Sequence, residues 1–222
     1  MTLRRRADNV NMGDMPYSRA RYHHGKLRDA LVAQAVRLIE IGGAQKFSLR
    51  EAARLEGVSP KAAYRHFADK SELLTAVAEI GFQMMERKLE EAIGAVSDLG
   101  DGAAAIERLK ATGRAYVEFA VDHPELLRVM FGSNGLAALE RDRALQPAAF
   151  LLLSETLDDL ARAGVLPADR RPGAELKAWT VVHGFASLVV GAGGAIQRTG
   201  ATSDALETVL DFAIVGLCGQ LK

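Results

Sequence analysis

The sequence has a single cysteine, Cys218, among its 222 residues. One thiol excludes an internal disulfide and a cysteine-rich metal site, so we expect a protein of the reducing cytoplasm. The formal net charge is zero, because the sequence has 28 Lys and Arg residues and 28 Asp and Glu residues. The total charge therefore indicates neither an acidic nor a basic partner.

Motifs of the common enzyme classes are missing as well. The sequence contains no His-Glu-x-x-His, no phosphate loop ending in Gly-Lys-Ser/Thr and no Gly-x-Ser-x-Gly. The segment GAGGAI at 191–196 lacks the third glycine of a nucleotide-binding loop. Glu155, Asp158 and Asp159 share one predicted helix, where a solvated acidic face is a simpler interpretation than a catalytic pair. We predict no enzymatic activity, no metal and no cofactor, with a helical enzyme or ligand carrier as the alternative.

One segment, 178–197, contains no Asp, Glu, Lys or Arg. Its length is close to the roughly 20 residues that a membrane-spanning helix needs. Thr180, His183, Ser187, Gln197 and four glycines make it less apolar than such a helix. We therefore predict a helix buried in the core or in a subunit interface, and no membrane partner.

The charges are unevenly distributed along the chain. Residues 1–70 contain 14 Lys and Arg but 7 Asp and Glu, whereas the remaining residues contain 14 and 21. This asymmetry favours a nucleic acid or another anionic surface as the partner of the first third. No apolar run follows Arg4, Arg5 and Arg6, so we expect no secretory signal and predict that 1–20 is a disordered basic arm.

Helical periodicity runs through almost the whole chain, and no segment sustains the alternation of a β-strand. We predict an all-α fold of about nine helices, in which an N-terminal three-helix head precedes a helical regulatory and dimerisation domain. The helices are expected near 26–41, 49–56, 60–67, 70–96, 103–121, 124–131, 147–164, 174–192 and 203–219.

The segment 48–67 has the pattern of a helix-turn-helix. Ser48 begins one short helix, Gly57 suits the turn, and Ser59-Pro60 begins a second helix. On that second helix Ala63 and Phe67 share one side, and Lys61 and Arg65 share the other. A helix that buries the first pair and exposes the second fits the major groove of DNA, whereas a solvated basic face is the alternative.

Other polar residues around these helices are candidates for phosphate contacts. The predicted DNA-binding residues are Lys26, Ser48, Arg50, Ser59, Pro60, Lys61, Ala62, Tyr64, Arg65, His66 and Lys70, with Arg19 and Arg21 as additional arm contacts.

The segment SLREAARLEGVSPKAAYRHFADKSELLTAV resembles the DNA-binding signature of TetR-family transcriptional regulators. The matching residues are Ser48, Leu49, Ala53, Gly57, Val58, Ser59, Tyr64, His66, Phe67, Lys70 and Leu73. Three positions depart from the signature: Ala52 replaces the usual Ile, Glu56 the usual Ala and Ala63 the usual Leu. Because Ala52 and Ala63 are smaller than the usual Ile and Leu, we expect fewer apolar contacts in the core of the head.

The segments HPELLRVMF and WTVVHGFASLVVGAG resemble the family variant that carries Trp-x-x-x-His-Gly, here Trp179, His183 and Gly184. The resemblance implies a homodimer formed by the last two long helices and a ligand cavity in each regulatory domain. Exposed apolar helix faces independently favour the dimer. Candidate cavity residues are Met84, Tyr116, Phe119, His123, Met130, Phe131, Phe150, Trp179 and His183, although His123 also suits a helix cap and His183 a core position.

Taken with these residues, the resemblance predicts a helix-turn-helix domain at 21–70 and a ligand-binding and dimerisation domain at 71–222. The expected function is a transcriptional regulator of palindromic operator DNA, acting as a repressor that a small apolar or aromatic effector releases. A constitutive DNA-binding protein without an effector is the alternative, and the sequence does not separate repressor from activator.

Overall fold

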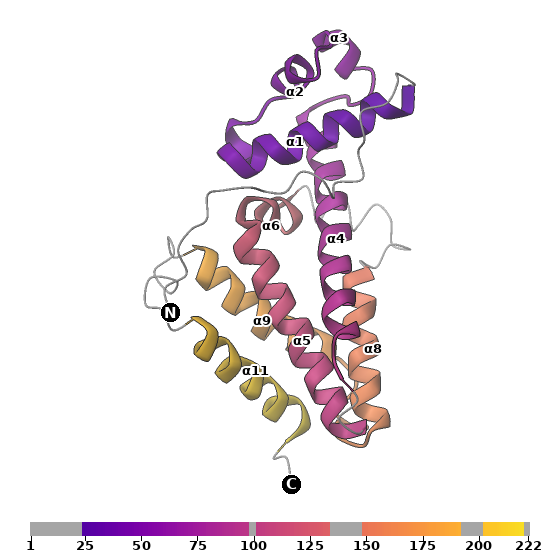
Figure 1. Ribbon diagram of the computed structural model, residues 1–222, viewed down its shortest axis with the longest axis vertical. Coiled ribbons are helices and arrows are strands. Elements are labelled where there is room, and N and C mark those ends of the chain that lie inside the picture. Colours follow the sequence, from indigo (N-terminus) through magenta and orange to yellow (C-terminus); the bar gives the residue numbers. More distant parts are fainter. Residues whose placement is uncertain (1–23, 98–100, 134–147, 192–201, 220–222) are drawn as a thin grey trace.

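The computed structural model describes residues 24–97, 101–133, 148–191 and 202–219 (Figure 1). The predicted arm 1–20, Arg19, Arg21 and Pro147 lie outside these residues. Nine helices and no strand occur in the described part, which confirms the all-α prediction. They are α1 (His24–Lys46), α2 (Leu49–Leu55), α3 (Pro60–Ala63), α4 (Lys70–Gly94), α5 (Asp101–Asp122), α6 (Pro124–Met130), α8 (Ala148–Arg162), α9 (Ala174–Gly191) and α11 (Thr202–Cys218).

Side-chain caps position the short helices of the head as the sequence predicts. The N–H of Glu51 donates to Ser48 Oγ at 3.2 Å, and the N–H of Ala62 donates to Ser59 Oγ at 3.3 Å. Gly57 has a φ of 70°, which its lack of a side chain permits, and turns the chain between α2 and α3. These local bonds fix how α2 and α3 begin and how they are joined.

The helix α3 is shorter than expected, because its regular α-helical residues end at Ala63 instead of Phe67. The chain continues to wind: the N–H groups of Arg65 and His66 donate to the carbonyls three residues earlier, and that of Phe67 to Ala63. This tighter turn still buries both Ala63 and Phe67, as predicted.

The core of the head is built from small residues at its centre. Ala52 and Ala63 are completely buried, and Phe67 is buried beneath the guanidinium of Arg28, which lies 5.1 Å from its ring centre. The departure at Glu56 has a structural role, because Gln34 Nε2 donates to its carboxylate at 2.6 Å. This bond ties α2 to α1 beside the turn.

The long helix α4 leads from the head into the body, where α5, α6 and α8 pack against it, while α9 and α11 pack against α5 (Figure 1). On this helix Met85 is buried, whereas the candidate cavity residue Met84 is half-buried. At Gly81, α4 and α6 approach so closely that an added Cβ would lie 2.6 Å from Met130 Sδ.

Phe150, one of the candidate cavity residues, lies partly at the surface. It is 36% exposed at the start of α8, while Leu157 and Leu160 farther along the helix are completely buried. Among the described helices, none is long and apolar enough to cross a membrane.

Candidate functional site

The outer surface of the head exposes most of the predicted DNA-binding side chains. Ser48, Arg50, Ser59, Pro60, Lys61, Tyr64 and Arg65 are exposed, as is Lys26. Ala62 and His66 are half-buried beside them. Lys70 is half-buried too, and its Nζ donates to the carbonyl of Gln45 at 3.3 Å, so it holds the end of α1 as well as facing this surface.

The cations of the head differ from those of the body in their pairing. From Leu27 to Lys70, no Lys or Arg forms an ion pair with a carboxylate of the described part of the chain; the residues are Arg28, Arg37, Lys46, Arg50, Arg54, Lys61, Arg65 and Lys70. In the body, seven cations are ion-paired: Lys88, Arg108, Lys110, Arg114, Arg128, Arg162 and Arg171. The head thus offers positive charge that its own structure does not neutralise.

A second candidate site is a cavity of about 400 Å³ inside the body. Its walls come from five helices and the residue after α6. The lining residues are Phe82, Met85 and Leu89 of α4; Leu109, Lys110, Thr112, Gly113 and Tyr116 of α5; Phe131 after α6; Ala149, Phe150 and Leu153 of α8; Leu176, Ala178, Trp179 and Val182 of α9; and Leu210, Ala213, Ile214 and Leu217 of α11. The size and apolar lining are those of a small-molecule site.

Four of the predicted cavity residues lie in this wall: Tyr116, Phe131, Phe150 and Trp179. His183 stands directly behind it, with its ring centre 4.8 Å from that of Phe131. Sequence reasoning missed the aliphatic lining from α4, α5 and α11, because Leu, Ile and Ala at helical spacing have the same pattern in a cavity wall as in a solid core.

The other predicted cavity residues lie elsewhere. Phe119 and Met130 are buried among core side chains, and Met84 lines a shallow surface hollow with Lys88 and Glu118. His123 occupies the position before α6 but makes no side-chain cap; its Nδ1 instead contacts Glu40 of α1. Glu40 and His123 therefore connect the head to the body.

Aromatic rings form one end of the cavity. Phe131 contacts Phe82 edge-on at 5.6 Å between ring centres and Trp179 at 5.8 Å. Trp179 in turn lies 5.1 Å from His183. Such a cluster offers both faces and edges to a flat apolar molecule.

Three polar side chains in the wall, those of Tyr116, Thr112 and Lys110, already have partners within the protein. The hydroxyl of Tyr116 is 2.7 Å from His183 Nδ1, and Thr112 Oγ1 donates to the carbonyl of Arg108 at 2.8 Å. Lys110 is ion-paired with Asp211. A polar ligand would therefore lose its hydrogen bonds to water without finding free partners on these side chains.

Burial keeps the hydrogen-bonded aromatic pair uncharged. It raises the pKa of Tyr116 far above the usual range of a phenol and lowers the pKa of His183 below that of a free imidazole. Both rings are thus neutral at pH 7, and neither supplies a charge to the cavity.

The lowered pKa of His183 leads to a prediction about stability. Below about pH 6.5 the unfolded chain binds a proton at this histidine more readily than the folded chain does. The stability of the wild type should therefore fall more steeply from pH 8 to pH 5.5 than that of His183→Gln. Thermal unfolding of both proteins at these two pH values provides the measurement, and equal losses of Tm would contradict the assignment.

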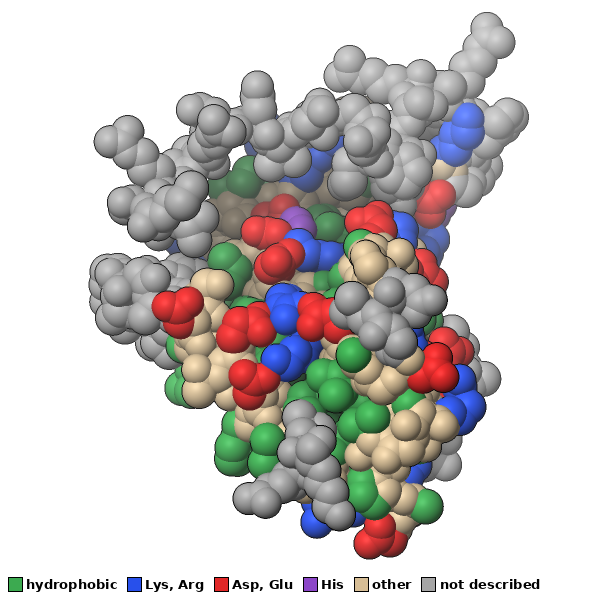
Figure 2. Space-filling model, turned by 60° about the horizontal axis from the view of Figure 1, so that its bottom comes forward, with side chains coloured by type: hydrophobic (Ala, Val, Ile, Leu, Met, Phe, Trp, Pro, Cys, Tyr) green, Lys and Arg blue, Asp and Glu red, His purple; other side chains and the backbone are tan. Residues whose placement is uncertain are grey.

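Ion pairs hold the last helix against the body. Arg114 of α5 contacts both Glu107 and Glu207, the latter on α11, while Lys110 contacts Asp211 one turn farther along α11. The hydrogen bond from Arg114 lowers the pKa of Glu207. Figure 2 shows one face of the molecule, on which acidic and basic side chains lie next to one another.

The outer sides of α9 and α11 carry exposed apolar side chains. Leu188 is 61% exposed, Phe212 69% and Val215 48%. Beside them, Gly184 and Gly216 are exposed, with open space where a Cβ would stand. Large apolar groups next to flat glycine surfaces form a face suited to close helix packing.

Two family models match the sequence. Residues 31–77 match the model for bacterial regulatory proteins of the tetR family, and residues 109–213 match the tetracyclin repressor-like C-terminal domain. The chain belongs to the TetR family. A search of curated proteins gives no match.

Solved structures with the same fold extend over nearly the whole chain. A protein of unknown function from Rhodococcus sp. RHA1 is 31% identical, with a TM-score of 0.71 and coverage of 90% of this chain and 100% of the other. AibR in complex with isovaleryl coenzyme A and operator DNA is 17% identical, with a TM-score of 0.53 and coverage of 88% and 100%. A single-residue variant of TetR from Acinetobacter baumannii AYE, in complex with minocycline, is 18% identical, with a TM-score of 0.58 and coverage of 88% and 96%.

Proposed function

We propose that this TetR-family chain is a homodimeric transcriptional repressor that binds a palindromic operator and releases it when a small apolar or aromatic effector enters the cavity. It acts in the cytoplasm and catalyses no reaction. The head, residues 21–70, binds DNA, and residues 71–222 bind the effector and the second copy.

The observation that carries the DNA-binding role is the unneutralised positive charge of the head. Seven cations of the body are ion-paired, whereas Arg50, Lys61 and Arg65 of the head are exposed and have no carboxylate partner in the described part. Side chains of this kind bind phosphates and base edges. We assign base contacts to Lys61 and Arg65, with Ala62 close enough for a methyl contact.

The remaining predicted residues position the head on the DNA backbone. At the starts of α2 and α3, the first-turn N–H groups that the Ser48 and Ser59 caps do not use are the proposed donors to phosphate oxygens, while Pro60, which has no N–H, fixes the start of α3. Tyr64 and His66 extend this edge. The remaining proposed phosphate contacts come from Lys26, Arg50 and Lys70.

The cavity favours a neutral effector over a charged one. Isovaleryl coenzyme A and minocycline are ligands in structures of relatives with this fold. The cavity here is small, and its one lysine is already paired with Asp211, so the phosphates of a coenzyme A thioester would lack a counter-charge. A compact aromatic or aliphatic molecule fits this lining better.

The route from cavity to head runs through α6. Phe131, which follows this helix, lies in the cavity wall, and His123, which precedes it, contacts Glu40 of the head. Gly43, near the end of α1, comes close to Glu125 in the first turn of α6. An effector that prefers one position of Phe131 would therefore also bias the position of the head.

A second copy of the chain would cover the apolar face of α9 and α11. Dimerisation places two heads side by side, as a palindrome with two half-sites requires. The proposed interface consists of Thr180, Gly184, Ser187 and Leu188 of α9 with Thr208, Phe212, Val215 and Gly216 of α11.

Titration of labelled DNA from upstream of its own gene tests the proposal directly. We expect specific binding that weakens steeply between about 50 and 200 mM salt, on the order of a thousandfold, as counterions replace phosphate contacts. Random DNA of the same length and composition is the control. Equal affinity for both DNAs would contradict a specific regulator.

A further inference from the structure

Two exposed residues border the cavity, one on α8 and one on α9. Of its lining residues only two are exposed: Phe150 on α8, at 36%, and Leu176 on α9, at 63%. The lining residues from α4, α5 and α11 are buried or half-buried. An apolar molecule that enters through the described part of the protein would therefore pass between Phe150 and Leu176.

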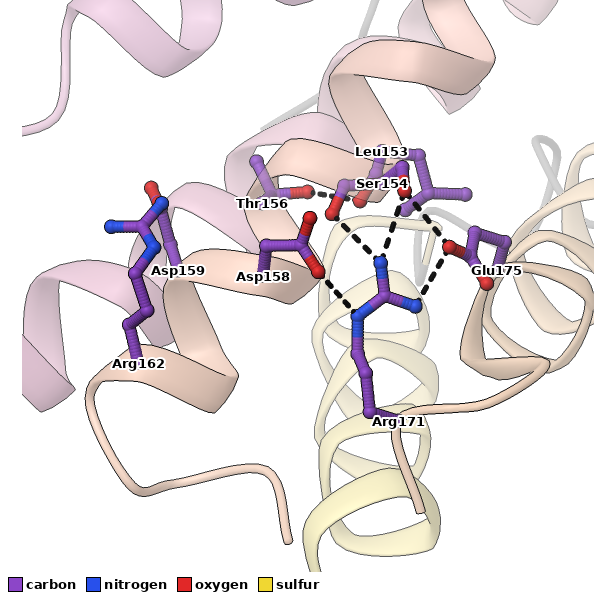
Figure 3. A network of polar contacts seen from close by, with 8 residues as sticks. All are labelled: Leu153, Ser154, Thr156, Asp158, Asp159, Arg162, Arg171 and Glu175. Atoms are coloured by element: carbon purple, nitrogen blue, oxygen red, sulfur yellow. Dashed lines mark hydrogen bonds and ion pairs between the residues drawn. The ribbon is translucent and has the colours of Figure 1, made fainter. Parts of the chain in front are cut away.

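A polar bridge spans the same two helices. Arg171, in the connection between α8 and α9, donates from Nε to Asp158 at 2.7 Å and from Nη1 to Glu175 at 2.7 Å (Figure 3). Its Nη2 donates to the hydroxyl oxygen of Ser154 at 3.0 Å and to the Ser154 carbonyl at 3.3 Å. The Ser154 hydroxyl in turn donates to Glu175 at 2.9 Å, which closes the bridge.

The bridge borders the opening on both helices. Ser154 is one helical turn beyond Phe150 and follows the lining residue Leu153, and Glu175 immediately precedes Leu176. The guanidinium is mostly shielded from water, with 21% of the Arg171 side chain exposed and 15% of Glu175. Charged hydrogen bonds in such a setting are stronger than those of exposed pairs.

We propose that the space between Phe150 and Leu176 is the entrance of the cavity and that Arg171 is a positioning residue that controls how often it opens. This inference rests on the proposed function, because it assumes that the cavity takes up an apolar ligand. The bridge itself does not touch the cavity lumen: it holds α8 and the start of α9 together, and the entrance widens when the bridge opens.

A gate of this kind has a kinetic signature. Removing Arg171 should speed entry and exit alike, because both pass the same barrier, while the affinity of the closed cavity stays nearly the same. Removing one charged hydrogen-bonding group lowers the free energy that opening the entrance requires. The association and dissociation rate constants should therefore both rise on the order of tenfold. A residue that merely supports the cavity wall would instead change the affinity.

Stopped-flow binding of N-phenyl-1-naphthylamine, a neutral aromatic probe, measures these rates. Energy transfer from Trp179, the single tryptophan of the chain and part of the cavity wall, reports on binding in the cavity itself. The variants are Arg171→Met, which keeps an apolar stem, and Ser154→Ala, which removes one side-chain arm of the bridge and should have a smaller effect. Arg162→Met is the matched control, since Arg162 contacts Asp159 and makes no bond to α9 in the described part (Figure 3).

The outcomes separate the gate from the cavity. Faster association and dissociation in Arg171→Met with a Kd within about twofold of wild type, and an unchanged Arg162→Met, would support the gate. Wild-type rates in Arg171→Met, or a weaker Kd at an unchanged association rate, would overturn the gate while leaving the proposed function intact. Failure of the probe to bind the wild type would overturn the apolar cavity, and the gate with it.

Discussion

Lys61→Ala and Arg65→Ala should each weaken operator binding on the order of a hundredfold while leaving the fold intact. Each substitution removes a contact from both half-sites of a dimer, and a base-edge or phosphate contact contributes about 1–3 kcal/mol. Both side chains are exposed and have no ion-pair partner in the described part, so their loss leaves no buried group unsatisfied. Fluorescence anisotropy with labelled operator gives the affinity, and thermal unfolding checks the fold.

The salt dependence of the two variants tests the assignment of base contacts to Lys61 and Arg65, because losing a base contact should leave the salt slope almost unchanged. Where the lost contact is to a phosphate, the slope of log K against log salt falls by about 1 for each contact removed, or about 2 for a dimer. Arg162→Ala, at an exposed position on α8, is the control and should bind operator like the wild type. Normal binding by both head variants would show that another face of the head contacts DNA.

Phe212→Asp should convert the dimer into a monomer. The side chain is 69% exposed in the isolated chain, so a charge there costs little for folding, but it would be buried without a partner between two copies. A cost of about 3–5 kcal/mol at each of two symmetry-related positions raises the dimer dissociation constant by several orders of magnitude. Sedimentation velocity over a range of protein concentrations provides the measurement.

The matched control for this variant is Leu151→Asp. Leu151 is 47% exposed on α8, outside the proposed interface of α9 and α11, and its substitution should leave the dimer unchanged. Gly184→Trp offers an independent test, because open space surrounds this glycine in a single chain and a large ring there would separate two packed helices. A Phe212→Asp protein that sediments as a dimer would contradict the proposed interface.

Local chemistry explains which parts of the head could be predicted from sequence. The caps at Ser48 and Ser59 and the turn at Gly57 depend on residues within a few positions of each other, and the structure forms them as expected. At the start of α4, Asp69 and Glu72 form a capping box that differs from the usual one in one hydrogen bond. Asp69 accepts from the N–H of Glu72, but the Glu72 carboxylate accepts from Ala68 instead of Asp69.

Longer-range features required the structure. Helix α4 buries a wide stripe, since it is surrounded by several helices, and its period therefore could not distinguish Met84 from Met85. The contact between Glu40 and His123 joins residues that are 83 positions apart, and the bridge at Arg171 depends on how α8 and α9 pack. Neither the Glu40–His123 contact nor the bridge at Arg171 corresponds to a recognisable sequence motif.

The uneven distribution of positive and negative charge along the chain gives this neutral protein the character of a dipole. Positive charge predominates in the first 70 residues and negative charge in the rest, while the molecule as a whole carries none. The field of a DNA duplex would turn such a molecule before contact, attracting the head and repelling the body. Productive encounters should then be more frequent than random collision allows, and this orienting effect should fade as added salt shortens the range of the field.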